Sequence, residues 1–201
     1  MKAELRREMR RRRRALPPTQ RRRAAEALAR AAETASPFRR ARRVAVYLSA
    51  DGEIDPAPLV RLAWRLGKEV YLPVVPRQGG RLGFRRYRPD SVLRPGRFGL
   101  LQPAGSRSLP ARRLDLVLAP LVAFDRSGHR LGMGGGFYDR TFAATGGRHW
   151  GRPRLLGLAY AFQELDALPA EPWDLPLWGV LTDRGLCRCA GRGLSATDEL
   201  G

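Results

Sequence analysis

A glycine-rich stretch that follows an apolar run constrains this chain more than any other feature. Residues 116–120 are apolar and typical of a strand, and residues 130–136 have the sequence Arg-Leu-Gly-Met-Gly-Gly-Gly. Because glycine lacks a Cβ, such a loop can take positive φ and bring its N–H groups close to an anion. A strand that leads through a glycine-rich loop into a helix, here predicted at 137–144, is a common place for phosphate in α/β proteins.

Two charged side chains flank this stretch. Arg130 supplies a cation just before the glycines, and Asp139 falls in the first turn of the predicted helix. A carboxylate close to phosphate is understandable if Mg²⁺ lies between them, because Mg²⁺ usually takes one or two carboxylates plus phosphate oxygens. The stretch matches neither GxxxxGK[ST] nor GxGxxG. On these residues alone, a turn that merely lets a loop pass a helix remains an open alternative.

The whole stretch resembles the signature of the 5-formyltetrahydrofolate cyclo-ligase family, also called 5,10-methenyltetrahydrofolate synthetases. That signature has Phe-Asp, then Arg-Leu-Gly-x-Gly-x-Gly-Tyr-Tyr-Asp, and the chain matches it from 124–125 through 138–139. Phe137 replaces the first Tyr and loses its hydroxyl, and Met133 stands where Tyr or Arg is frequent. The resemblance implies an ATP-dependent ligase that converts 5-formyltetrahydrofolate to 5,10-methenyltetrahydrofolate with release of ADP and phosphate. ATP would phosphorylate the formyl oxygen, and N10 would then close the ring.

The resemblance also implies where ATP binds. Lys2 and Arg6 are four positions apart, so they share one face of the helix predicted at 2–14. They fit the Lys-x-x-x-Arg pair with which the family contacts ATP phosphates. Arg130 would position phosphate too, and no further catalytic side chain is expected, because phosphoryl transfer depends mainly on positioning and charge neutralisation. The expected ATP-binding residues are Lys2, Arg6, Arg130, Leu131, Gly132, Met133, Gly134, Gly135, Gly136, Phe137 and Tyr138.

The folate and metal sites are implied in the same way. Glu53 and Ile54 fit a family pair that contacts the pterin ring, and they follow a predicted strand at the carboxyl edge of the sheet, where α/β proteins bind ligands. Asp139 and Asp174 fit the carboxylates that hold Mg²⁺, while Trp178 stands where the family often has a further Asp. The expected folate-binding residues are Glu53, Ile54, Met133, Gly134, Gly135, Gly136 and Phe137.

Apolar runs and helix signals alternate along the chain, which predicts parallel βαβ units. The expected fold is a three-layer α/β/α single domain with a mainly parallel, Rossmann-like sheet, and it is similar to the sugar-phosphate isomerase and CoA-transferase class that the family resembles. We expect a cyclo-ligase domain at 1–183 and a disordered tail at 184–201, which is rich in Gly, Arg and Ser. The predicted strands lie at 43–48, 69–73, 82–87, 114–120, 154–159 and 179–182, and the predicted helices at 2–14, 19–34, 55–67 and 137–144.

The charge balance leaves two other functions open. A net charge of +19 is typical of nucleic-acid binding, and residues 10–14 are consecutive arginines. However, no recognised nucleic-acid module is present and no aromatic side chains are interleaved with this run, so we interpret it as a solvated helix face. The positive field is expected to attract ATP and polyglutamylated folate. The second possibility is an inactive family relative, which the departures at Met133, Phe137 and Trp178 keep open.

No apolar run approaches the roughly 18 residues that span a bilayer, and the start lacks the apolar segment of a secretory signal. We therefore expect a cytoplasmic monomer with no membrane partner and no specific nucleic-acid partner. Cys187 and Cys189 are expected to be free thiols, because a zinc site needs about four ligands and the two histidines, His129 and His149, lie far from this C-x-C pair in the sequence. Trp64, Trp150 and Trp173 are expected to be packing residues.

Overall fold

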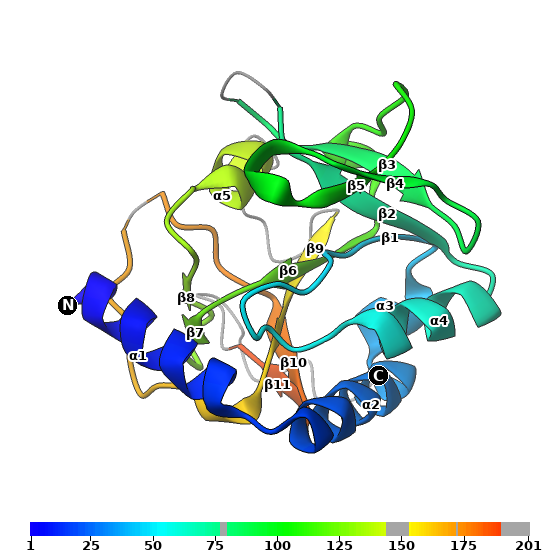
Figure 1. Ribbon diagram of the computed structural model, residues 1–201. Coiled ribbons are helices and arrows are strands. Elements are labelled where there is room, and N and C mark those ends of the chain that lie inside the picture. The colour runs from blue at the N-terminus through cyan, green and yellow to red at the C-terminus, as the bar shows by residue number, and fades with distance from the viewer. Residues whose placement is uncertain (77–79, 144–152, 172, 190–201) are drawn as a thin grey trace, which may run out of the picture.

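A seven-stranded sheet organises the fold of the computed structural model, which describes residues 1–76, 80–143, 153–171 and 173–189 (Figure 1). The strand order is β11-β10-β9-β6-β1-β2-β3. The five strands from β10 to β2 are parallel, and only β3 and β11 at the edges are antiparallel. The strands are β1 (Arg43–Ala45), β2 (Glu69–Val74), β3 (Gly83–Tyr87), β6 (Leu116–Pro120), β9 (Arg154–Ala159), β10 (Gly179–Thr182) and β11 (Gly185–Arg188). The prediction of a mainly parallel sheet is confirmed.

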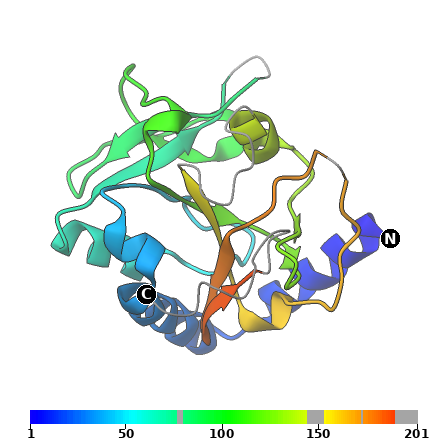
Figure 2. The same ribbon diagram turned by 180° about the vertical axis from the view of Figure 1, so that it is seen from behind.

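Helices cover the two faces of this sheet unequally. The helices are α1 (Lys2–Ala15), α2 (Pro18–Thr34), α3 (Ser36–Arg40), α4 (Ala57–Arg65) and α5 (Phe137–Phe142). On one face α2, α3 and α4 pack against the strands, and on the other, among the described residues, the short α5 shares the cover with loops (Figures 1 and 2). The predicted three-layer α/β architecture is therefore confirmed. Helix α2 begins at Pro18 rather than Thr19, because proline has no N–H that needs a partner in a first turn.

The sheet is apolar on both faces, as parallel strands covered on both sides require. Four of the five residues of β6 and five of the six in β9 are buried. Side chains alternate between faces along each strand, so Leu116 and Leu118 enter the core beneath α2 and α4, while Val117 enters the core that includes Phe142 of α5. The two cores fix the strand ends on which the loops of the site are mounted.

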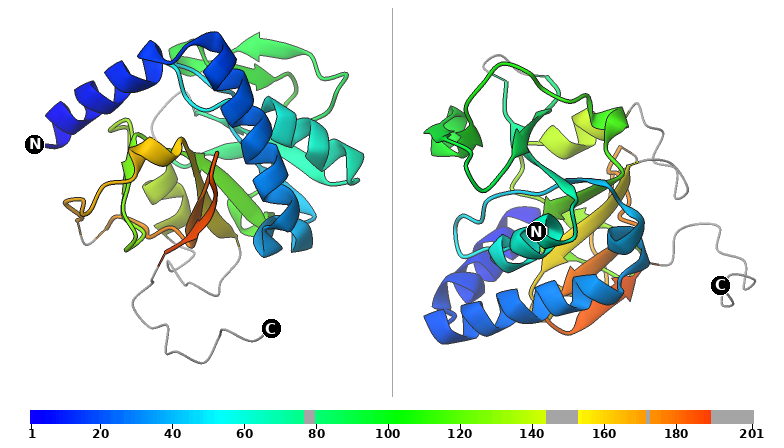
Figure 3. Two further views of the ribbon diagram at one scale, coloured as in Figure 1. Left: turned by 90° about the horizontal axis from the view of Figure 1, so that it is seen from below. Right: turned by 90° about the vertical axis from the view of Figure 1, so that its right-hand side faces the viewer.

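Helix α1 lies outside these layers and packs on a small hairpin at the carboxyl edge of the sheet. The hairpin pairs β7 (Ala123–Phe124) with β8 (Arg130–Leu131). Met9 of α1 is buried against this hairpin in a cluster that includes Val122 and Leu131. The left view of Figure 3 shows α1 leading away from α2 past the β7–β8 hairpin. A second small sheet pairs β4 (Leu93–Pro95) with β5 (Leu101–Pro103).

The predicted disordered tail is wrong at its start. Residues Gly185–Arg188 form β11, an antiparallel partner of β10 across a two-residue turn, with Thr182 facing Gly185. Gly185 has a φ of 127°, which favours glycine in such a tight turn. Cys187 and Cys189 are free thiols, as expected. Residues 190–201 lie outside the described residues.

Two further expectations about side chains need correction. The arginine run at 10–14 is not simply a solvated face, because Arg13 is fully buried. Trp64 packs as predicted, with its indole N–H donating to the Tyr87 carbonyl at 3.1 Å, but Trp173 is 69% exposed. Trp150 lies outside the described residues. Across the part of the chain that the structure describes, no helix combines the length and the apolar character needed to cross a membrane.

Candidate active site

The glycine loop, residues 132–136, connects β8 to α5 and has the backbone conformation that its sequence predicts. Gly134 has a φ of 99° and Gly136, which precedes α5, has a φ of 58°. A Cβ at Gly135 would lie 2.9 Å from a ring carbon of Phe137. Side chains at these positions would be strained or would clash, so the glycines leave the backbone of the loop open to a ligand.

Arg130 and Asp139 meet behind the glycine loop. The Arg130 guanidinium donates to Asp139 Oδ1 at 2.6 Å and to the Leu175 carbonyl at 2.6 Å. Asp139 Oδ1 also lies 3.3 Å from the Leu175 N–H, so the segment that carries Asp174 lies against α5. The two predicted metal carboxylates therefore come from neighbouring segments. Within the described residues, Asp139 Oδ2 accepts no hydrogen bond.

The carboxylate of Asp174 interacts with a backbone N–H of its own loop and with a lysine of α1. Its Oδ2 accepts the Glu171 N–H at 2.9 Å and lies 3.8 Å from Lys2 Nζ, which is 3.3 Å from Glu171 Oε1. The described residues contain no cluster of three or more metal-binding side chains. Two carboxylates with few other protein ligands suit Mg²⁺, which keeps waters and takes phosphate oxygens, better than they suit zinc. The residues present therefore fit the predicted ion.

Helix α1 brings a cation to the other side of the glycine loop. Arg6 Nε donates to the Gly132 carbonyl at 2.8 Å, and a Cβ at Gly134 would lie 3.8 Å from Arg6 Cζ. Lys2 lies one turn earlier on the same helix, near Asp174. The structure thus brings Lys2, Arg6 and Arg130 to the loop region from two different elements. Leu131 is different, because its side chain is buried in the cluster beneath α1 and only its backbone can face a ligand.

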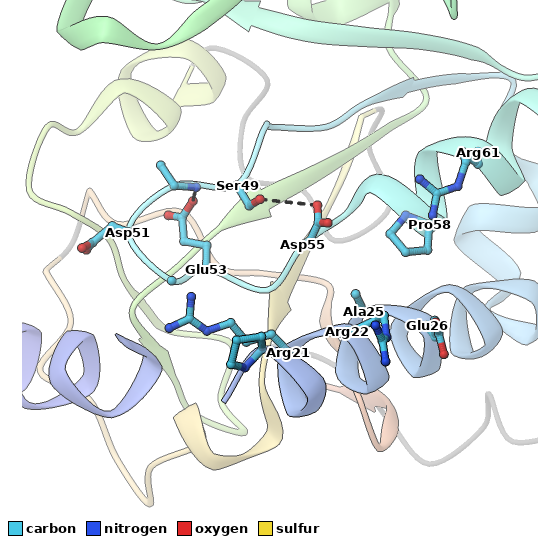
Figure 4. Close-up of a pocket in the computed structure, with 13 residues that line it drawn as sticks. Arg21, Arg22, Ala25, Glu26, Ser49, Asp51, Glu53, Asp55, Pro58 and Arg61 are labelled. Carbon is cyan, nitrogen blue, oxygen red and sulfur yellow. Dashed lines mark hydrogen bonds between the residues drawn. The ribbon is translucent and has the colours of Figure 1, made fainter. Parts of the chain in front are cut away.

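Residues 49–55, which we call the acidic loop, follow β1 and carry the predicted folate contact. The Glu53 carboxylate is half-buried and accepts the Ala50 N–H at 3.1 Å (Figure 4). Burial raises the pKa of Glu53, and the Ala50 hydrogen bond and the charge of Arg13 partly oppose that shift. Ile54 is buried in the core, and its carbonyl accepts the Tyr47 hydroxyl at 3.1 Å. Ile54 therefore anchors the loop through the core.

Electrostatic coupling connects the acidic loop with the helix that follows the glycine loop. The pKa of the partly buried Tyr138 is raised, first by burial and then by the charge of Glu53, while Arg130 lowers it. The acidic loop follows β1 and the glycine loop follows the β7–β8 hairpin beyond β6, so both loops lie at the carboxyl edge of two neighbouring parallel strands.

Sequence reasoning missed an aromatic side chain beside the glycine loop. Phe98, between β4 and β5, places its ring 6.2 Å from that of Phe137, with an edge-on angle of 65°. Phe98 is 67% exposed and has a φ of 59°, an unusual conformation for a bulky residue. The Phe-Gly segment at 98–99 was visible in the sequence, but nothing local indicated that it would reach Phe137.

Asp125 of the signature supports the site from within the core. It is 1% exposed, and its carboxylate accepts the N–H groups of His129 and Leu168 at 3.0 and 2.9 Å. Its Oδ2 also lies 2.9 Å from Nδ1 of His129. These bonds close the turn between β7 and β8, immediately before Arg130. Asp125 therefore has a structural role in aiming the glycine loop.

A cavity of about 520 Å³ lies between the acidic loop, the start of α2 and α4 (Figure 4). Glu53 and Asp55 line it together with Arg21, Arg22 and Arg61. Arg21 binds the end of α1, because its Nε donates a hydrogen bond to the Leu16 carbonyl at 2.9 Å. No residue of the glycine loop lines this cavity, and Glu53 is the predicted folate-binding side chain that does.

A mainly parallel α/β fold with a glycine loop and a carboxylate-bearing loop at the carboxyl edge of the sheet is typical of a phosphate-handling α/β enzyme. The chain belongs to the 5-formyltetrahydrofolate cyclo-ligase family, whose sequence model matches residues 1–183. The resemblance found in the sequence and the predicted enzyme class, an ATP-dependent ligase of folate one-carbon metabolism, are confirmed.

Individual relatives agree with this family assignment. The chain is 46% identical over 152 residues to the 5-formyltetrahydrofolate cyclo-ligase of Escherichia coli K12, covering 74% of this chain and 82% of that one. It is 43% identical over 148 residues to that of Haemophilus influenzae, covering 71% and 76%. The solved structure of Aquifex aeolicus 5,10-methenyltetrahydrofolate synthetase matches with a TM-score of 0.80 at 30% identity, over 100% of this chain and 99% of that one.

Proposed function

We propose that this protein carries out the reaction of its family, the ATP-dependent conversion of 5-formyltetrahydrofolate to 5,10-methenyltetrahydrofolate. The observation that carries the proposal is the glycine loop, which Arg6 contacts at Gly132 and Arg130 precedes, at the same carboxyl edge of the sheet as the loop that carries Glu53. This arrangement supports one site for phosphate-binding groups and a pterin-binding carboxylate. The glycine-loop signature and the family match over 1–183 both support it.

The residues around the glycine loop would hold the triphosphate. The loop N–H groups can donate to phosphate oxygens, because its glycines present no side chains in between. Arg6 and Lys2 approach from α1, and Arg130 is held by Asp139 and by the Leu175 carbonyl, so its guanidinium is already oriented. Asp139 and Asp174 would hold Mg²⁺, which neutralises phosphate charge when bound. Fixed cations and N–H groups lower the barrier mainly by positioning and charge stabilisation.

The acidic loop would hold the folate. The ionised Glu53 can accept N–H groups of the pterin ring, and the Ala50 hydrogen bond fixes its orientation. The formyl oxygen then attacks the terminal phosphorus of ATP and ADP leaves. N10 attacks the activated formyl carbon, phosphate departs with the former formyl oxygen, and N10 loses its proton. The chain supplies orientation for both steps, and no side chain needs to form a covalent bond with the substrate.

We further propose that the protein acts as a cytoplasmic monomer. Cys187 and Cys189 are free thiols, which suits a reducing compartment. The family match favours the ligase over the arginine-rich nucleic-acid-binding protein. A binding titration at rising salt separates these two, because nucleic-acid binding through phosphate contacts weakens steeply with salt.

The decisive experiment follows the absorbance of the methenyl product after protein, Mg-ATP and 5-formyltetrahydrofolate are mixed. We expect an ATP-dependent rise that Asp139→Ala slows by about 100-fold or more, because a metal carboxylate contributes several kcal/mol to charge stabilisation. A chelator should abolish the rise and added Mg²⁺ should restore it. Asp90→Ala, in an exposed turn away from the site, is the matched control and should keep full activity. A flat trace from folded wild-type protein would contradict the proposal and point to an inactive relative.

A further inference from the structure

One carboxylate in the acidic loop is engaged by three arginines of α1. Asp51 Oδ2 accepts Arg10 Nε at 2.6 Å and Arg13 Nη2 at 3.2 Å, and its Oδ1 accepts Arg14 Nε at 2.5 Å. Burial alone would raise the pKa of Asp51, but the hydrogen bonds and charges of Arg10 and Arg14 together outweigh it and lower the pKa. Asp51 is two residues from Glu53, which makes it the link between α1 and the predicted folate contact.

The contact between α1 and the acidic loop is also closely fitted. Arg13 is fully buried, and its Nη1 donates to the Leu121 carbonyl at 3.2 Å, just beyond the end of β6. Gly52 has a φ of 73°, and a Cβ there would lie 3.2 Å from backbone atoms of Arg13 and Arg14. The loop therefore lies directly on the helix backbone, and a larger residue at position 52 would be strained and closely crowded.

The opposite half of the same helix holds the glycine loop. Arg6 Nε donates to the Gly132 carbonyl, and Arg6 and Arg13 are separated by seven residues, about 10 Å along a helix axis. A helix over this length is stiff, so movement at one contact is transmitted to the other. Thus α1 is in direct contact with both loops that flank the site.

We propose that α1 is a strut that couples the two substrate sites, with Asp51 as the positioning residue that fixes the strut to the acidic loop. This inference rests on the proposed function, because it takes ATP at the glycine loop and folate at Glu53. ATP that engages Arg6 and Lys2 holds α1 in place, and the seated helix holds Asp51 and Glu53 in the geometry for the pterin. Each substrate thereby tightens the binding of the other, and the coupling is reciprocal.

Binding measurements on the full-length protein test the strut directly. We would measure the Kd of 5-formyltetrahydrofolate with and without a non-hydrolysable ATP analogue and Mg²⁺. In the wild type we expect the analogue to tighten folate binding about fivefold or more, the lower end of typical coupling. Asp51→Asn should bring this ratio close to one and raise the KM of both substrates. Asn tolerates the φ of 53° at this position, so the variant mainly removes charge.

Two comparison variants separate coupling from simple loss of stability. Glu8→Gln removes a carboxylate from the exposed face of the same helix, where it pairs with Arg11 at 2.8 Å, and should leave the ratio unchanged. Gly52→Ala disturbs the fit and keeps every charge, and should also lower the ratio. A lower melting temperature with an unchanged ratio in Asp51→Asn would overturn the proposal, and so would a wild-type ratio within twofold of one.

The outcomes also separate this inference from the proposed function, because the ratio is measured without turnover. Intact coupling in a protein that forms no methenyl product would refute the reaction and support the strut. Full turnover without coupling would refute the strut and support the reaction.

Discussion

The glycine loop and the acidic loop, which we propose flank one site, are held in different ways. The glycine loop depends on shape, since Gly134 and Gly136 take positive φ and Arg6 reaches only a neutral carbonyl, that of Gly132. The acidic loop depends on charge, since Asp51 accepts hydrogen bonds from three arginines. The comparison indicates that a loop binding a polyanion leaves its own donors free, whereas a loop presenting a carboxylate needs cations to hold it.

The largest expected effect comes from removing the charge that holds the acidic loop. Asp51→Ala removes the carboxylate from the buried Arg13 guanidinium, which keeps only the backbone carbonyls of Leu121 and Asp51, and losing a hydrogen bond between charged groups costs about 2 kcal/mol of folding free energy. Urea unfolding of this variant and of Glu8→Ala would measure the difference. We expect a clear loss of stability only in the first, because Glu8 pairs with Arg11 in solvent. Equal midpoints for the two variants would show that the three arginines contribute little to the fold.

The next effect tests the loop that depends on shape. Gly134→Ala places a Cβ at a φ of 99°, which costs about 1–3 kcal/mol, so we expect KM for ATP to rise about tenfold. Gly105→Ala is the matched control, because Gly105 also has positive φ, at 117°, but lies in a loop outside the site. That variant should lose stability and keep its KM. An unchanged KM in Gly134→Ala would mean that the ligand does not need this backbone conformation.

The same difference explains what the sequence could predict. Glycines, strand periodicity and the signature at 124–139 are local patterns, so the parallel sheet and the glycine loop followed from them. The ion pairs of Asp51 join residues about forty positions apart, so the arginine run was interpreted as a solvated face. Strand β11 was missed because the Gly, Arg and Ser content of residues 184–201 was interpreted as disorder. The turn at 183–184 was a local sign of a hairpin.

Burial patterns also decided which predicted site residues can reach a ligand. Glu53 and Ile54 are adjacent in the sequence, yet Glu53 is half-buried at the site and Ile54 is 1% exposed in the core. Likewise Leu131 packs beneath α1 while its neighbour Arg130 faces Asp139. A sequence motif contains both residues that can contact a ligand and residues that pack beneath them. Only the packing in the structure distinguishes the two kinds.

The smallest expected effect concerns Glu53, the carboxylate of the acidic loop whose ionisation is disfavoured by burial. Because burial raises its pKa, the folded protein binds the Glu53 proton more tightly than the unfolded chain does. Its contribution to stability is therefore present below the unfolded pKa of about 4.3 and is lost as pH rises through the higher folded pKa. Glu53→Gln keeps an oxygen acceptor for the Ala50 N–H and carries no charge.

We therefore expect Glu53→Gln to be slightly more stable than the wild type at pH 7–8, with the difference vanishing at acid pH, while its KM for 5-formyltetrahydrofolate rises. Thermal unfolding across pH and substrate titration would measure both. Lower stability at neutral pH would show that the attraction between Glu53 and Arg13 outweighs the cost of burial. The acidic loop would then be held by two carboxylates rather than one, and Glu53 would join Asp51 in seating α1.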